Sequence, residues 1–157
     1  MSTYCVTWGV ILALVVLGAP LDPQTASAAS HACAPTRPDG LGPFYEPHAP
    51  ERNETGQGLV ISGTVRSARD CRPLAGAVIE WWSANPRGDY DAAHRATQRA
   101  NADGHYQYTT DMPGQYPGRP PHLHIRVTAP KHRTLVTQVY PQPDQTALNL
   151  DLVLVPQ

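Results

Sequence analysis

Apolar and polar residues alternate with a period of two in several short stretches of this chain. The stretches are residues 59–65, 77–82, 105–110, 122–127, 134–140 and 148–155. In the first, LVISGTV, the apolar residues Leu59, Ile61 and Val65 fall on one side of an extended chain. Successive side chains of a strand point to opposite faces, so this period indicates strands with one face toward a core.

Turn-forming residues separate these stretches. They are Arg69-Asp70, Asn85-Pro86-Arg87-Gly88, Asp103-Gly104 and Met112-Pro113-Gly114. An Asp-Gly pair between strand-like stretches is typical of a two-residue hairpin turn, which predicts a hairpin at Asp103-Gly104. Six or more short strands with regular turns predict an all-β fold, an antiparallel β-sandwich in a single domain.

The first 28 residues have a different character. Residues 10–17, VILALVVL, are apolar but too few to cross a bilayer, which takes about 20 residues. A small-x-small pattern, Ala26-Ser27-Ala28, follows them. This predicts a signal peptide over residues 1–28, cleaved near Ala28 or Ala29, and an exported protein, secreted or periplasmic, that no membrane holds after cleavage. Because no Lys or Arg precedes the apolar residues, a buried N-terminal helix or a membrane anchor is the alternative.

The predicted mature chain has two parts. Residues 29–57 are rich in Pro and Gly and are expected to form an extended arm, followed by the sandwich core at 58–157. Cys33 lies in the arm and Cys71 in the core, while Cys5 belongs to the signal peptide. An even pair of cysteines in an exported domain predicts a disulfide, with two unpaired thiols as the alternative.

The charge balance argues against two classes of partner. The chain has 12 basic and 13 acidic residues, and it shows no basic stripe. Neither nucleic acid nor an anionic membrane surface is therefore an expected partner.

Two histidines one residue apart, His122 and His124, suggest a metal site. On a strand they share one face, while Leu123 and Ile125 point the other way into the core. A lone His-x-His pair also occurs by chance, and no carboxylate follows it before Asp144, so the usual pattern of two histidines and one carboxylate is missing.

Tyrosines lie near this pair instead. Tyr90 follows the turn at Gly88, and Tyr116 follows Pro113-Gly114. A phenol ionises near pH 10 in water, so a phenolate ligand requires a strongly charged cation to lower that pKa. Ferric iron does this, and tyrosine is an iron ligand in catalase. Two imidazoles and two phenolates would suit Fe(3+).

These motifs resemble the intradiol ring-cleavage dioxygenase family, which includes the catechol and protocatechuate 3,4-dioxygenases. The matching stretches are GPFY at 42–45, residues 62–90, residues 103–127 and LVTQVY at 135–140. The Fe(3+) ligands implied by this resemblance are Tyr90, Tyr116, His122 and His124. It also implies that Arg119 is the active-site arginine and that Gln138 is its companion glutamine.

The resemblance implies a reaction as well. A catechol-type substrate would chelate the iron, Tyr116 would leave while Tyr90 stayed bound, and Arg119 would stabilise negative charge on the ring. Dioxygen would then cleave the ring between its two hydroxylated carbons to a cis,cis-muconate-type product. Family enzymes are longer, with a helical dimerisation region or a second type of subunit. This chain has only the minimal sandwich, which leaves the substrate and a homo-oligomer open.

Two other interpretations remain. A non-catalytic transthyretin-like or carbohydrate-binding module would use such turns and would place Trp81-Trp82 in packing or on a sugar-stacking surface, but it would not need His122 and His124. A copper or zinc His-x-His protein would leave Tyr90 and Tyr116 unexplained.

Overall fold

A computed structural model describes residues 33–115 and 118–157. The predicted signal peptide and Tyr116 lie outside the described residues. Within them the chain forms eight strands. Their bounds are β1 (Leu59–Ser67), β2 (Val78–Ala84), β3 (Tyr90–Arg99), β4 (His105–Thr110), β5 (Leu123–Thr128), β6 (Leu135–Val139), β7 (Ala147–Asn149) and β8 (Leu152–Leu154).

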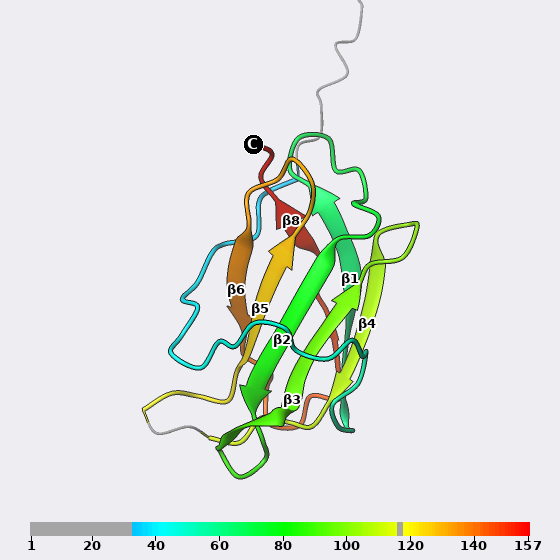
Figure 1. Cartoon of the computed structure of the whole chain (residues 1–157). Coiled ribbons are helices and arrows are strands. Elements are labelled where there is room, and N and C mark those ends of the chain that lie inside the picture. Colours follow the sequence, from blue (N-terminus) through cyan, green and yellow to red (C-terminus); the bar gives the residue numbers. More distant parts are fainter. Residues whose placement is uncertain (1–32, 116–117) are drawn as a thin grey trace, which may run out of the picture.

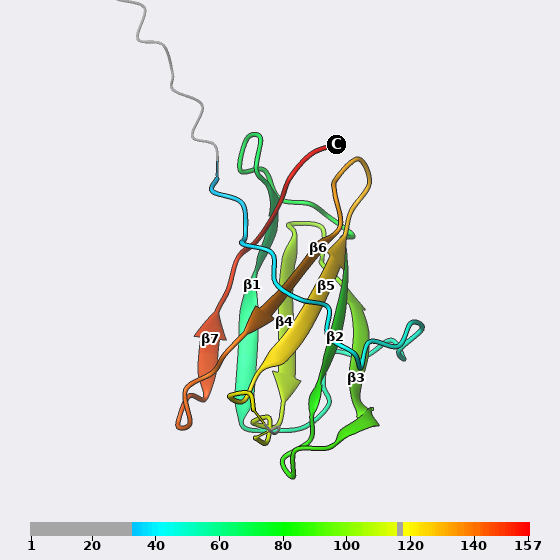
Figure 2. The ribbon, with the colours of Figure 1, turned by 90° about the vertical axis from the view of Figure 1, so that its left-hand side faces the viewer.

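The strands form two sheets that face each other, which confirms the all-β sandwich (Figures 1 and 2). One sheet has the order β4-β1-β7, with β8 also paired to β1, and the other has the order β3-β2-β5-β6. All pairs in the second sheet are antiparallel. In the first sheet β1 pairs with β4 antiparallel, but with β7 and β8 parallel.

The predicted alternation decides which side chains form the core. Leu59, Ile61 and Val65 of β1 are fully buried, as expected. On β2 the indole of Trp81 points inward and stacks on Tyr108 of β4, with ring centroids 4.5 Å apart. Such apolar burial is the main stabilising contribution to a sandwich of this size.

The longest strand, β3, was not among the predicted strands. Apolar and polar residues do not alternate in its sequence, YDAAHRATQR, and neither does burial, since His94, Arg95 and Ala96 are buried in succession. One face of β3 packs on the core and the other is covered by the arm, where Arg95 donates to the carbonyl of Phe44 at 2.6 Å. Burial on both faces removes the two-residue period on which the prediction depended.

The predicted hairpin at Asp103-Gly104 is wrong. The turn is present, with Gly104 at a φ of 73°, but it joins β3 to β4, which lie in different sheets. The stretch 148–155 also differs from expectation, because it divides into β7 and β8. Between them the carbonyl of Leu150 passes so close to Gly63 that a Cβ there would lie 1.9 Å from its oxygen.

The segment before β1 crosses the outer face of the β3-β2-β5-β6 sheet (Figure 1). It is attached by backbone hydrogen bonds, including those from Asp39 to Val136 at 2.9 Å and from Arg52 to Thr97 at 3.0 Å. We call residues 33–57 the arm. No helix in the described part of the chain is long and apolar enough to span a membrane.

A disulfide joins the start of the arm to the core, as predicted. Cys33 and Cys71 are bonded, with their Cα atoms 5.2 Å apart and a sequence separation of 38. Closing a loop of about 40 residues stabilises the fold by about 3–4 kcal/mol, chiefly by restricting the unfolded chain.

Candidate metal centre

His122 and His124 meet on the outer face of the sheet, under the arm. Both are buried, and their Nε2 atoms lie 3.1 Å apart. A metal–imidazole bond is about 2.1 Å long, so two nitrogens at right angles on one ion lie about 3 Å apart. The spacing of this pair therefore suits two ligands of a single metal ion.

The backbone before β5 sets the orientation of the first imidazole. Nδ1 of His122 lies 2.7 Å from the carbonyl oxygen of Pro120, to which it can only donate. In the neutral ring the lone pair is then on Nε2, the atom that faces His124. Metal-bound histidines are commonly held by such a contact from the other ring nitrogen.

The second imidazole is desolvated and packed against two groups. The ring of His124 stacks on Trp82 of β2, with centroids 4.9 Å apart and planes within 4°. Gly42 of the arm also comes so close to this ring that a Cβ would lie 2.8 Å from Cε1 of His124. Gly42 also has a φ of 74°, so two constraints favour glycine at this position.

The electrostatics keep His124 neutral. Burial, together with the neighbouring His122, lowers the pKa of His124 to about 4. Its Nδ1 is buried and has no hydrogen-bond partner among the described residues. A metal bound at Nε2, the atom that faces His122, would not pair this Nδ1, but a neutral imidazole has a lone pair that it can donate to a cation at Nε2.

Tyr90 supplies a third donor. Its phenol oxygen lies 3.4 Å from Nε2 of His122, and its ring stacks on Phe44 of the arm with centroids 4.3 Å apart. Tyr90 begins β3, opposite Ala84, after an irregularity in the β2–β3 ladder. The structure therefore brings together three of the predicted ligands: Tyr90, His122 and His124.

The fourth predicted ligand, Tyr116, lies outside the described residues. The residues that lead to it are described, and they pack on the turn before Tyr90. The amide of Gly114 donates to the carbonyl of Asn85 at 3.0 Å, and a Cβ on Gly88 would lie 2.5 Å from the carbonyl oxygen of Gln115.

The donors fit a ferric ion better than a softer or carboxylate-bound metal. Across the part of the chain that is described, no group of three His, Cys, Asp or Glu residues could hold a metal. A metal at this position would use a phenol oxygen in addition to the two imidazoles, and a hard, anionic phenolate favours a highly charged ion.

The side chains of Arg119 and Gln138, both predicted site residues, are in contact. Nη2 of Arg119 donates to Oε1 of Gln138 at 2.7 Å and to the phenol oxygen of Tyr140 at 2.8 Å. Nε2 of Gln138 donates in turn to the carbonyl of Gly40 in the arm at 2.6 Å. The guanidinium is thus held by two side chains next to the histidines.

Sequence reasoning did not identify Tyr140 and Asp39 as parts of this network. The ring of Tyr140 lies 5.7 Å from that of His122, and its hydroxyl donates to Oδ2 of Asp39 at 3.2 Å. The Gly40 amide, the Tyr140 hydroxyl and the charge of Arg119 hold the pKa of Asp39 below its usual value. The two-residue spacing of Gln138 and Tyr140 was the available signal, since it places both on one face.

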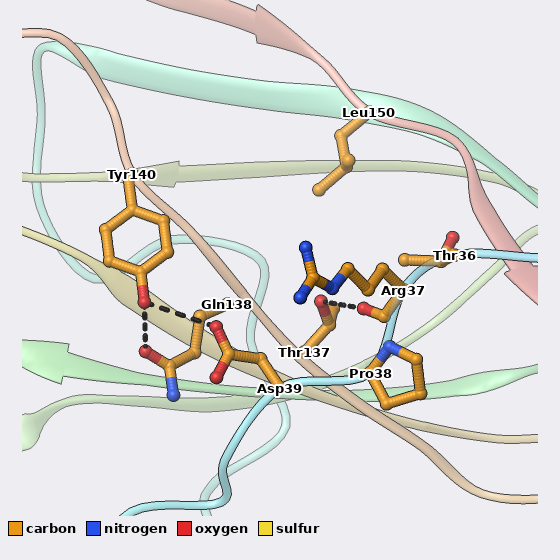
Figure 3. Close-up of a pocket in the computed structure, with 8 residues that line it drawn as sticks. All are labelled: Thr36, Arg37, Pro38, Asp39, Thr137, Gln138, Tyr140 and Leu150. Atoms are coloured by element: carbon orange, nitrogen blue, oxygen red, sulfur yellow. Dashed lines mark hydrogen bonds between the residues drawn. The ribbon is translucent and has the colours of Figure 1, made fainter.

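A cavity of about 460 Å³ adjoins this network, between the arm and β6. Figure 3 shows Tyr140 at one side of it, bonded to Gln138 and Asp39. The full lining is Thr36, Arg37, Pro38, Asp39, Thr137, Gln138, Tyr140 and Leu150. The cavity touches the arginine network rather than the three metal donors.

Trp81 and Trp82 do not form a sugar-stacking surface. They are 1% and 2% exposed, so neither can present its ring to a carbohydrate. Trp81 is part of the core, whereas Trp82 lies between His124 and Tyr45, whose ring centroid is 5.1 Å away. The tyrosine hydroxyl donates to Glu80 at 3.0 Å, and burial and this contact raise its pKa.

Comparisons with known proteins show which family this chain is similar to. The family model Dioxygenase_C, described as Dioxygenase, matches residues 45–118. The chain is 31% identical to 6-chlorohydroxyquinol 1,2-dioxygenase of Cupriavidus pinatubonensis over 70% of this chain and 52% of that protein. It is 28% identical to the intradiol ring-cleavage dioxygenase prcA of Aspergillus niger, over 76% of this chain and 49% of that protein.

Solved structures show the same similarity. The dioxygenase domain of a dioxygenase–carbohydrate-binding fusion protein from Streptomyces sp. SirexAA-E superposes with a TM-score of 0.71 at 30% identity, covering 79% of this chain and 100% of that one. Hydroxyquinol 1,2-dioxygenase of Pseudomonas putida shares the fold, with a TM-score of 0.70 at 19% identity over 83% of this chain and 69% of that one. The chain spans about half the length of the curated relatives that it matches.

Proposed function

We propose a catechol-cleaving activity for this chain, which belongs to the intradiol ring-cleavage dioxygenase family. In the proposed reaction O₂ opens a catechol-type ring between its two hydroxylated carbons, giving a cis,cis-muconate-type product. The observation that carries the proposal is the convergence of Tyr90, His122 and His124. Nε2 of His122 lies 3.4 Å from the phenol oxygen of Tyr90 and 3.1 Å from Nε2 of His124.

The family uses Fe(III), and the three donors fit it. Tyr90, His122 and His124 would hold the ion, with Tyr116 proposed as the fourth ligand by its place in the family motif. When bound, ferric iron supplies the electron-withdrawing centre that makes a chelated catechol reactive toward O₂. The protein contributes a fixed donor set under the arm, in which burial lowers the pKa of His124 and keeps that imidazole neutral.

Arg119 is proposed to stabilise negative charge on the ring. Its guanidinium is fixed in advance by Gln138 and Tyr140, so little reorganisation is needed when charge develops. Preorganised donors of this kind lower a reaction barrier by several kcal/mol in favourable cases. Gln138 and Tyr140 act through Arg119 and are therefore positioning residues.

We also propose that the protein is exported after cleavage near Ala28 or Ala29. The Cys33–Cys71 disulfide supports export, because such bonds persist in oxidising compartments. N-terminal sequencing of the protein recovered from the periplasm or medium of its own host would test this. An intact N-terminus in the cytoplasm would refute it.

Iron loading and oxygen uptake test the proposed activity together. The iron-loaded protein should absorb visible light through its phenolate ligands and should consume O₂ with at least one member of a panel of catechols and hydroxyquinols. His122→Ala should lose iron and activity. Loaded protein that is colourless, or that consumes no O₂ with any diol in the panel, would contradict the proposal.

The two tyrosines should respond differently to substitution. Tyr116→Phe should retain iron on three protein ligands but shift the visible band, whereas Tyr90→Phe should weaken iron retention, since Tyr90 is stacked on Phe44 next to His122. Iron content and spectra with and without catechol would compare them. Identical behaviour of the two variants would contradict distinct roles.

A further inference from the structure

A buried histidine, His94 of β3, lies between two carboxylates close to Tyr90. It is 8% exposed. Its Nδ1 lies 2.8 Å from Oδ1 of Asp91, and its Nε2 lies 3.2 Å from Oδ2 of Asp111. Ionised carboxylates only accept hydrogen bonds, so a ring nitrogen of His94 that carries a proton donates to the carboxylate that it faces. The proposed function makes no use of these three residues.

One end of this network reaches the turn that leads to Tyr90. Asp91 follows Tyr90 directly, and its Oδ2 accepts a hydrogen bond from Nδ2 of Asn85 at 2.9 Å. The Oδ1 of Asn85 accepts the amides of Arg87 at 2.9 Å and Asp89 at 3.2 Å. The network thus continues into the internal hydrogen bonds of the turn.

The other end reaches the segment that leads to Tyr116. Asp111 begins this segment just after β4, and its Oδ1 accepts the amide of Gln57 in the arm at 3.0 Å. The same segment is joined to the first turn, because Gly114 donates to the carbonyl of Asn85 at 3.0 Å. Two segments distant in sequence therefore share one set of partly buried contacts.

The strand ladder alone does not hold the first of these segments. The β2–β3 register shifts between Trp82 and Ala84, and the Ala84–Tyr90 pair is the last of the ladder. A ligand at the end of a ladder needs further contacts to stay within a fraction of an ångström of its position. Hydrogen bonds to carboxylates are stronger than neutral ones and can meet this need.

We propose that His94 is a positioning residue that joins two described segments, residues 85–90, which end in Tyr90, and residues 111–115, which precede Tyr116. The inference rests on the proposed function, since it concerns ligands of the same iron site. Through Asp91, His94 orients the segment that ends in Tyr90, and through Asp111, His94 orients the segment that precedes Tyr116.

The test replaces His94 with a side chain of similar size that cannot donate. In the metal-free protein, His94→Phe should speed backbone hydrogen exchange at least tenfold in both 85–90 and 111–115. In the iron-loaded protein it should shift the visible band and weaken iron binding about tenfold. The matched control is His132→Phe, because both ring nitrogens of His132 also lie within hydrogen-bond distance of oxygen atoms. His132 belongs to the loop between β5 and β6, and Figure 1 shows this loop at the opposite end of the sandwich from the start of β3. The control should change neither readout.

Each outcome has a distinct meaning. Unchanged exchange in either segment, or an unchanged band and iron affinity in His94→Phe, would overturn the positioning role. If His94→Phe does not fold, Asp111→Asn provides the same test, with faster exchange expected in 111–115 and slight change in 85–90. If the wild-type protein binds iron but shows no phenolate band, both the proposed function and the positioning role are overturned. If the wild-type protein shows the band and His94→Phe leaves it unchanged, only the positioning role is overturned.

Discussion

The two faces of β2 and β5 are both buried, but by different partners. The inner face carries Trp81 and Ile125 and packs on the opposite sheet. The outer face carries Trp82 and His124 and is covered by the arm. The indole of Trp81 stacks on Tyr108, whereas Nε1 of Trp82 and Nδ1 of His124 have no hydrogen-bond partner among the described residues.

Burial between the two sheets and burial under the arm therefore have different effects. Apolar burial between two sheets stabilises the fold, because it removes hydrocarbon surface from water. Burial under an arm also removes water, but from polar rings, and so it lowers the pKa of His124 and keeps that imidazole neutral and able to bind a cation. The inner face should therefore control stability and the outer face should control metal binding.

The neighbouring tryptophans provide the strongest test of this comparison. Trp81→Ala should lower the free energy of unfolding by about 3–5 kcal/mol, the usual cost of deleting a large buried aromatic ring. Trp82→Ala should cost less, because an arm can adjust over the gap more easily than a sheet. Chemical denaturation of the metal-free variants would measure both, and equal losses would contradict the distinction.

His124→Ala should show the reverse pattern. Iron affinity should fall about 100-fold or more, equivalent to about 2.7 kcal/mol, while the metal-free protein loses less stability than Trp81→Ala does. Iron titration and denaturation would be run side by side. His105→Ala is a suitable control, since His105 is exposed on the other sheet and bonds to Thr64 at 3.0 Å. Undiminished iron affinity in His124→Ala would show that His124 is not an iron ligand.

Arg119→Leu should sharpen the comparison within the outer face. It should lower kcat roughly 10- to 100-fold and leave iron content and colour nearly unchanged, since Arg119 is expected to act on charge that builds during the reaction. Tyr140→Phe removes one of its two acceptors and should have a smaller effect in the same direction. Steady-state oxygen uptake would measure both, and loss of iron in Arg119→Leu would argue for a structural role instead.

The attachment of the arm should depend weakly on pH through Asp111. The Gln57 amide and His94 lower the pKa of Asp111 in the folded state, against the opposing effect of burial. A carboxyl group with a lowered folded-state pKa stabilises the fold above its unfolded value, about 3.9, and this contribution is lost as the pH falls through the folded-state pKa. The stability difference between wild type and Asp111→Asn should be present at pH 7 and shrink below about pH 4. A difference independent of pH over this range would exclude the ionised carboxylate as its source.

The sequence by itself determined the features that depend on local periodicity and residue chemistry. The two-residue period separated Trp81 from Trp82 and placed His122 and His124 on one face, because side-chain direction on a strand depends only on position along it. The cysteine pair also predicted the disulfide, because two cysteines remain after the predicted signal peptide, and the structure confirms that bond.

Only the tertiary structure decided which distant segments meet. β3 has no period because the core and the arm bury both of its faces, and the Asp103-Gly104 turn looks like a hairpin although its strands join different sheets. The approach of Gly42 to His124, and the placement of His94 between Asp91 and Asp111, also depend on how the arm and the loops pack over the finished sandwich. Such contacts join residues far apart in sequence, and no local pattern encodes them, because their geometry exists only once both sheets have formed.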